Sequence, residues 1–299
     1  MWNGIFLLWF ILVVPSVIFV AVDIYRNTPE APVMKAAFVI LTLFTGPLGA
    51  FFYVLGCREP IKGTHAQYVS VAWRQVLGST MHCAAGDGLG IIVGSAIGLI
   101  VGLAVVPNFF LGYVLGFSFG WGYFQAFAMR DMAGGDYLKS LKMTFMPEFL
   151  SMNFLMSAMA LVTVFAGAHV PGGRDPGMPG FWWIASMSLI AGFICAYPMN
   201  WWMVTNHMKH GMITVIDAAA KKAAKARTSE MASGDMSSMH MDGMESADGE
   251  MARMEGDMEG MDQGEMSMAG PARGAVIKAS IISVSVLAVT VVVVGIWGT

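Results

Sequence analysis

The chain has 299 residues, of which 56% are apolar and 12% charged, and its mean hydropathy is +0.63. A soluble domain could not bury several uncharged runs that each reach the roughly 20 residues of a membrane-spanning helix. The formal net charge of −3 averages two opposite regions, because residues 228–270 hold eleven Asp or Glu and one Arg while the remainder is basic. In lipid every backbone polar group must be paired within its own segment, so the composition predicts an all-α integral membrane protein.

Seven apolar runs predict about seven transmembrane helices. In chain order they are Trp2–Val22, Ala36–Cys57, two runs within Gly88–Met129 divided at Pro107 and Asn108, Phe149–Gly173, Pro176–Asn206 and Ala279–Thr299. The first run lacks a basic amino-terminal region and a cleavage pattern, so we interpret it as a retained helix and not as a secretory signal. The three cysteines, Cys57, Cys83 and Cys195, are too few and too scattered for a disulfide framework.

These runs divide the chain into five parts. Residues 1–57 hold two N-terminal helices, residues 58–80 a loop, residues 81–212 a four-helix membrane core, residues 213–274 a short helix and an acidic, disordered loop, and residues 275–299 the last helix. Seven helices place the two termini on opposite sides of the membrane. The N-terminal side then has eleven Lys or Arg close to helix ends and the other side three, which predicts a cytoplasmic N-terminus by the positive-inside rule. The first helix alone indicates the reverse, because its basic flank, Arg26 and Lys35, is on the other side.

Glycines recur every four residues in the third and fourth predicted helices. They are Gly86, Gly90, Gly94, Gly98 and Gly102 in one helix and Gly112, Gly116 and Gly120 in the next. Small residues at this spacing let two helix backbones approach closely in lipid. Because the turn at Pro107 is short, we expect an antiparallel and tightly packed helical hairpin.

The acidic loop is rich in methionine, with eleven Met between Met231 and Met268 and a four-fold Gly-acid-Met repeat. A thioether is a soft, neutral ligand that suits Cu(I). The candidate ligands in this loop are Met236, Met239, His240, Met241, Met244, Met251, Met254, Met258, Met261, Met266 and Met268. The alternative is a disordered acidic linker whose methionines act as an oxidant sink. Thioether sites suit an oxidising compartment, whereas the charge distribution places the loop in the cytoplasm, so the sequence leaves its compartment open.

A second set of candidates lies at the ends of the third to sixth helices that alternating topology brings to one side of the membrane. The candidate metal ligands there are His82, Cys83, Asp87, Glu148, Met203, His207 and His210. Ionisable groups at membrane depth are costly and mark a pathway or a paired site. The alternative is that these side chains lie at the lipid–water interface, where water and headgroups satisfy them.

Several short motifs carry a family resemblance. They are MHCAAGDG at 81–88, the Phe-Gln pair at 124–125, Met-Pro-Glu at 146–148, YPMNWW with KHGM within 197–212, and the upstream GPLGAFFY at 46–53. Residues 40–215 with these motifs resemble a bacterial membrane family known as domain of unknown function 4396, which implies a bacterial inner-membrane location but no mechanism. The methionine-rich segment resembles those of bacterial copper-resistance proteins and lies outside that family domain.

The leading hypothesis is a membrane protein that handles a soft metal, most simply Cu(I), by binding or transport. One alternative is a membrane-embedded, metal-dependent redox enzyme that uses His82, Asp87, Glu148 and His207, although the sequence favours a non-enzymatic role. Another is a structural or assembly partner that docks through the acidic loop. The expected partners are the lipid bilayer, a metal ion and a metal-carrying protein, with no nucleic acid.

Overall fold

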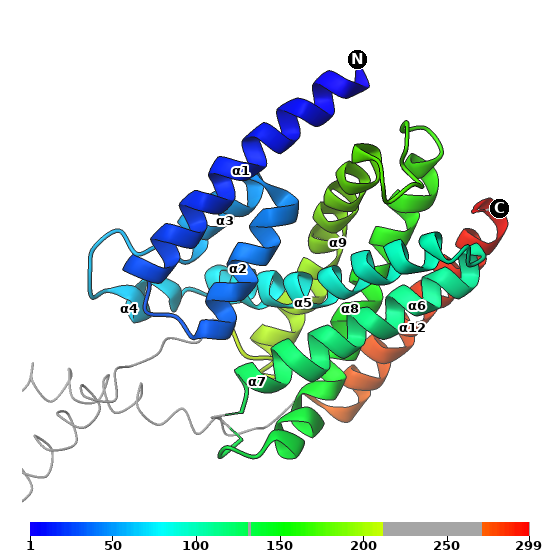
Figure 1. Ribbon diagram of the computed structural model, residues 1–299. Coiled ribbons are helices and arrows are strands. Elements are labelled where there is room, and N and C mark those ends of the chain that lie inside the picture. The colour runs from blue at the N-terminus through cyan, green and yellow to red at the C-terminus, as the bar shows by residue number, and fades with distance from the viewer. Residues whose placement is uncertain (131–132, 212–270, 299) are drawn as a thin grey trace, which may run out of the picture. The chain divides into compact units, whose positions relative to one another are not determined.

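Six helices in the described part of the chain are long and apolar enough to cross a membrane. The computed structural model describes residues 1–130, 133–211 and 271–298, and every regular element in them is helical (Figure 1). The six are α1 (Trp2–Asn27), α5 (Ala72–Ile100), the continuous run Val105–Ala128, α8 (Tyr137–Gly167), α9 (Pro179–Thr205) and α12 (Arg273–Trp297). The predicted all-helical membrane architecture is therefore confirmed. The predicted helix 217–227 and the methionine-rich loop lie outside the described residues.

The second apolar run does not form a single spanning helix. It divides into α2 (Pro32–Thr45) and α3 (Pro47–Gly56), which meet at Gly46 with a backbone φ of +55°. Glycine adopts a positive φ without steric cost, and the proline that follows disfavours helical geometry at the residue before it. The Gly46-Pro47 pair therefore ends one helix and starts another, and a seventh span is not confirmed.

The helices α2 and α3 form a short hairpin against α1. A Cβ added to Gly46 would lie 3.0 Å from Cγ2 of Val13, so the tip of the hairpin lies beside the middle of α1. At its base, the Tyr53 hydroxyl donates to Asp23 Oδ2 at 2.7 Å. With 14 and 10 residues, the two helices rise about 21 Å and about 15 Å, less than the roughly 30 Å of a bilayer core. The hairpin therefore returns to the end of α1 from which it started (Figure 1).

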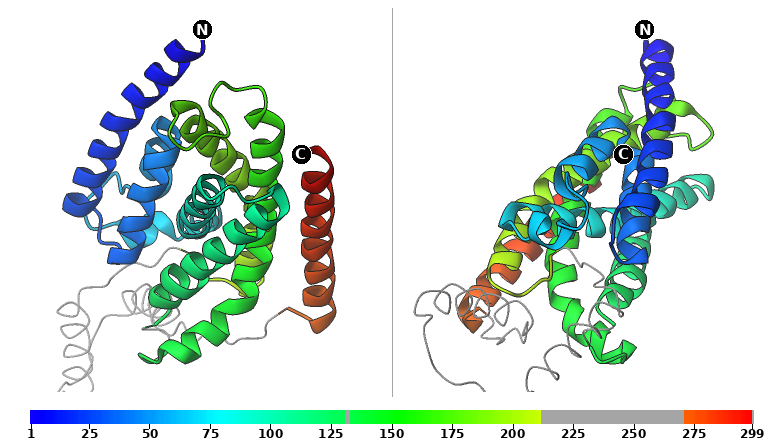
Figure 2. Two further views of the ribbon diagram at one scale, coloured as in Figure 1. Left: turned by 45° about the vertical axis from the view of Figure 1, so that its right-hand side comes forward. Right: turned by 90° about the vertical axis from the view of Figure 1, so that its left-hand side faces the viewer.

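This hairpin changes which helix ends lie together. We call one end of the helices the basal end. The helices α1, α7 (Ala126–Ala128) and α9 finish there, and α2, α5, α8 and α12 begin there. There the Tyr197 hydroxyl donates to the Trp73 carbonyl at 3.4 Å. At the opposite, distal end, Trp2 packs on Trp183 with ring centroids 5.7 Å apart, and Phe165 on Trp297 at 6.1 Å. Residues 2 and 297 are thus at the same end, and α12 runs alongside α8 (Figure 2).

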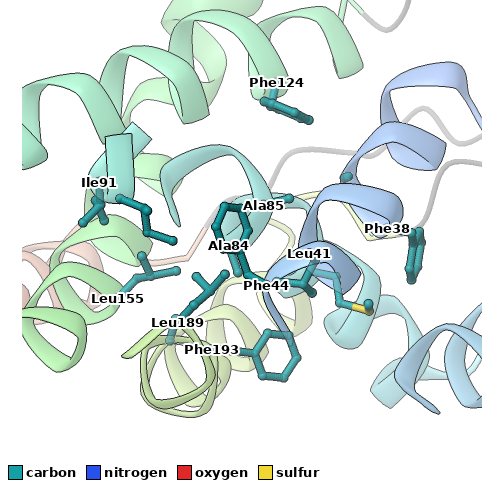
Figure 3. Packing of buried hydrophobic residues seen from close by; sticks show 14 of the residues in the cluster. Phe38, Leu41, Phe44, Ala84, Ala85, Ile91, Phe124, Leu155, Leu189 and Phe193 are labelled. Atoms are coloured by element: carbon teal, nitrogen blue, oxygen red, sulfur yellow. The ribbon is translucent and has the colours of Figure 1, made fainter. Parts of the chain in front are cut away.

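The helix α5 lies at the centre of the apolar core. It packs against α2, α8, α9 and both α6 (Val105–Phe117) and the π-helix η1 (Ser118–Gln125). Figure 3 shows Ala84 and Ala85 of α5 between Phe124 on one side and Leu189 on the other. The short helix α4 (His65–Val69) connects the hairpin to the start of α5.

Glycines bring α5 into backbone contact with α6 and η1. A Cβ on Gly86 would lie 2.9 Å from Gly120 Cα, and one on Gly90 would lie 2.6 Å from Gly116 Cα. A Cβ on Gly94 would lie 2.8 Å from Gly112 Cα. The predicted antiparallel hairpin with a glycine interface is therefore present, with three glycine pairs in register. The last two predicted glycines of the first series differ, because Gly98 faces the Asn108 side chain and Gly102 follows the end of α5.

We predict that Gly90→Ala lowers the stability of the protein, because the added methyl would overlap the Gly116 backbone and force the helices apart. Overpacking of this kind lowers the free energy of unfolding by about 1–3 kcal/mol. The matched control is Gly4→Ala, since no atom lies within 4 Å of a Cβ placed there. Thermal unfolding in detergent should show a lower melting temperature for Gly90→Ala than for Gly4→Ala. Equal melting temperatures would contradict the close packing.

Candidate functional site

A group of polar side chains is buried among α5, η1, α8, α9 and the residues that follow α9. We call it the buried polar cluster. Its members, all of them buried, are His82, Cys83, Asp87, Gln125, Glu148, Asn200, Lys209 and His210. The predicted candidates His82, Cys83, Asp87, Glu148 and His210 are thus brought together, from three separate stretches of sequence.

The Lys209 ammonium lies at the centre of three acceptors. Its Nζ is 2.7 Å from Cys83 Sγ, 3.0 Å from Asn200 Oδ1 and 3.3 Å from Glu148 Oε2. The Cys83 thiol in turn donates to Glu148 Oε2 at 3.2 Å. Both side chains of the Lys209–Glu148 ion pair are fully buried. The ammonium therefore compensates one carboxylate at a depth where an unpaired charge would be very costly.

A second carboxyl group, that of Asp87, faces the same space. A Cβ on Gly120 would overlap Asp87 Oδ1 and would lie 2.9 Å from Glu148 Oε1. The two carboxyl groups are therefore neighbours across a glycine that leaves them room. Among the described residues, neither oxygen of Asp87 has a hydrogen-bond partner, and Glu148 Oε1 has none. One ammonium cannot neutralise two buried carboxylates, so the cluster requires a further proton or cation.

Two histidines extend the cluster toward the basal end. His210 Nδ1 lies 2.9 Å from the Gly211 carbonyl and its Nε2 lies 3.2 Å from Gln125 Nε2, which fits a neutral ring that donates through Nδ1. Burial lowers the pKa of His210 to about 4, so this ring is neutral at pH 7. His82 packs near it, with ring centroids 6.2 Å apart, and neither nitrogen of the His82 ring has a hydrogen-bond partner within residues 1–130, 133–211 and 271–298. Both nitrogens of His210 are therefore engaged, whereas a neutral His82 ring has one unprotonated nitrogen that is free to accept a hydrogen bond or to bind a metal.

Irregular backbone positions these groups. Gln125 ends the π-helix η1, and such turns are frequent at functional sites. Pro147 and Pro198 lie inside α8 and α9, just before Glu148 and Asn200, and each removes a helical hydrogen bond. His207 has a φ of +56°, unusual for a residue other than glycine. This turn reverses the chain after α9, which returns Lys209 to the cluster.

Two predicted ligands of the membrane core lie elsewhere. His207 is exposed, because it forms the turn itself. Met203 is buried, but it packs in an apolar group with Leu150 and Ala279. The predicted ligands in the loop, from Met236 to Met268, lie outside the described residues. Sequence reasoning missed Lys209 as a member of the site, since a lysine after a helix in a membrane protein is usually a topology signal.

Residues 72–209 match the family described as a domain of unknown function, DUF4396. This supports the family resemblance of the sequence motifs over that range. The matched range begins at α5 and includes every member of the buried polar cluster except His210. The hairpin α2–α3 and the methionine-rich segment lie outside it. No curated protein and no solved structure matches the chain.

We predict that Lys209 and Glu148 are energetically coupled. Lys209→Met or Glu148→Gln alone should lower the free energy of unfolding by about 3–5 kcal/mol, because each substitution leaves a buried charge without its partner. The double variant should lose clearly less free energy of unfolding than the two single variants lose together, since it removes both charges. Thermal unfolding of the four proteins in detergent measures this coupling, with the exposed Lys62→Met as control. Additive losses would show that the ion pair does not hold the cluster.

Proposed function

We propose that this membrane protein handles a soft metal cation, most simply Cu(I), by binding it in the buried polar cluster. What supports the proposal is one observation: a thiol, an unpartnered imidazole and two carboxyls, three of whose oxygens lack a partner, are buried together among the helices. Thiolate and imidazole are ligands that Cu(I) prefers. The carboxylates of Asp87 and Glu148 add the negative charge that draws a cation to this depth.

Lys209 gives this site a route for exchange. Its ammonium already occupies the position of a cation, 2.7 Å from Cys83 Sγ and 3.3 Å from Glu148 Oε2. A metal ion that binds Cys83 must displace the thiol proton and part the ammonium from the sulfur. Metal binding to such ligands releases protons. We therefore propose that the cluster exchanges a metal cation for protons, with Lys209 holding the site when the metal has left.

The hairpin α2–α3 favours a six-crossing topology. In the described part of the chain, Arg174 is the one Lys or Arg at the distal end, and all others, including Arg26 and Lys35, lie at the basal end. The positive-inside rule then places the basal end in the cytoplasm of a bacterial inner membrane. The N-terminus is on the outer side in this proposal, opposite to the prediction from seven helices. The methionine-rich segment connects Gly211 to Pro271, both at the basal end.

The proposed topology predicts that residue 3 and residue 175 are on the same, outer side. Four crossings lie between them, α1, α5, the run Val105–Ala128 and α8, and an even number returns the chain to its starting side. A membrane-impermeant maleimide applied to intact spheroplasts should label Asn3→Cys and Asp175→Cys and leave Lys62→Cys unlabelled until lysis. These three positions are exposed in the structure. Labelling of Asp175→Cys together with protection of Asn3→Cys would instead support seven crossings.

The proposed function predicts that the purified protein binds more than one equivalent of Cu(I), shared between the loop and the cluster. Deleting residues 229–269 should remove most of the copper, and adding Cys83→Ser should remove the rest together with the proton release that accompanies binding. Cys195→Ser is the matched control, because Cys195 is an exposed cysteine on α9 outside the cluster. Copper content and pH-indicator titrations measure both effects.

Two results would overturn this assignment. Copper content unchanged by the loop deletion would exclude the loop as a copper site. Cu(I) binding by the loop-deleted protein that survives Cys83→Ser would exclude the cluster. If Asp87→Asn abolished a redox activity and left copper binding intact, the membrane-embedded enzyme would become the better reading. A protein partner that copurifies through residues 229–269 without metal would select the docking role.

A further inference from the structure

A second group of ligand-type side chains lies at the base of the hairpin, outside the buried polar cluster. Glu30 is in the link between α1 and α2, Cys57 directly follows α3, and His65 begins α4. One carboxylate oxygen, the sulfur and one ring nitrogen all lie within 4.8 Å of one another. From this geometry we propose that Glu30, Cys57 and His65 form a binding site for a divalent zinc-like metal ion.

The three ligand-type groups are buried without full hydrogen bonding, and a bound metal would explain this. Glu30 is 3% exposed, Cys57 0% and His65 2%. Glu30 Oε1 and His65 Nε2 lie 2.8 Å apart, yet Glu30 Oε2 and His65 Nδ1 have no hydrogen-bond partner in the part of the chain that the structure describes. A buried polar atom without a partner destabilises the folded protein, and more so where the group is charged. Two such atoms in one cluster indicate that a ligand satisfies them.

The donor set selects the class of metal. Sulfur, imidazole nitrogen and carboxylate oxygen are the three ligand types of zinc sites, whereas Ca²⁺ and Mg²⁺ do not favour a thiolate. The thiolate of Cys57 and the carboxylate of Glu30 carry two negative charges, which a divalent ion neutralises. A monovalent Cu(I) would leave one negative charge buried, which is unfavourable in a dry site. The site therefore fits Zn²⁺ better than the ion proposed for the buried polar cluster.

The position of the three ligands gives the metal a role. They come from three segments that the fold joins at the base of the hairpin, where the Arg58 guanidinium also donates to Asp23 Oδ2 at 2.8 Å. A metal bound there would fasten the end of α3 and the start of α4 to the link after α1. Because α4 leads directly into α5, it would fix the hairpin relative to the helix that carries Cys83 and Asp87.

The test uses the full-length protein in detergent. Metal analysis after Zn²⁺ loading and desalting should show one equivalent that Cys57→Ser and His65→Gln each lose and that Cys83→Ser and Cys195→Ser keep. Co²⁺ in place of Zn²⁺ should give a thiolate charge-transfer band that disappears in Cys57→Ser alone among the cysteine variants. A chelator should lower the melting temperature of the wild-type protein, and this test does not depend on whether a substituted protein folds.

Three outcomes would overturn the site. The first is equal Zn²⁺ content in the wild-type protein and Cys57→Ser. The second is a Co²⁺ band that depends on Cys83 and not on Cys57, which would assign the metal to the buried polar cluster. The third is a wild-type melting temperature that the chelator does not change. Since copper loading of Cys83→Ser is measured separately, failure of this site leaves the proposed function untouched, and failure of that function leaves this site untouched.

Discussion

The glycine contact between α5 and the run α6–η1 is the constraint on which the rest of the structure depends. Any side chain at Gly86, Gly90 or Gly94 would meet backbone of the facing helix. In lipid there is no hydrophobic force to hold two helices together, so this close packing replaces it. The same contact continues to Gly120, where the missing side chain leaves the space that Asp87 and Glu148 share.

That space explains why the protein tolerates so many buried polar groups. A charge at membrane depth persists where partners surround it, and the Lys209 ammonium supplies one partner for Cys83, Glu148 and Asn200 at once. The other three carboxyl oxygens of Asp87 and Glu148 have no hydrogen-bond partner among the described side chains and backbone. With both carboxyl groups ionised, the cluster is one positive charge short of neutral, and a proton or a bound cation can supply that charge.

The two proposed metal sites differ in chemistry and in position. The buried polar cluster offers a thiol, an imidazole and an ammonium group among the membrane helices, and the proposed displacement of that ammonium would suit exchange of a soft, monovalent ion. The group of Glu30, Cys57 and His65 offers two negative charges on short connecting segments and suits a divalent ion that fastens them. Each includes residues at the basal end, where α1, α7 and α9 finish and α2, α5, α8 and α12 begin.

The sequence by itself determined the membrane class, the helical architecture, the glycine interface and the short motifs that carry Cys83, Asp87 and Glu148. These depend on apolar length, on four-residue spacing and on the cost of ionisable groups in lipid, all of which are local properties. Tertiary structure alone decided that Ala36–Cys57 is a hairpin, because Gly46 and Pro47 change the direction of the chain without changing its hydropathy. It also decided that Lys209 is buried and that Glu30, Cys57 and His65 meet, since contacts between distant segments leave no periodic signal in the sequence.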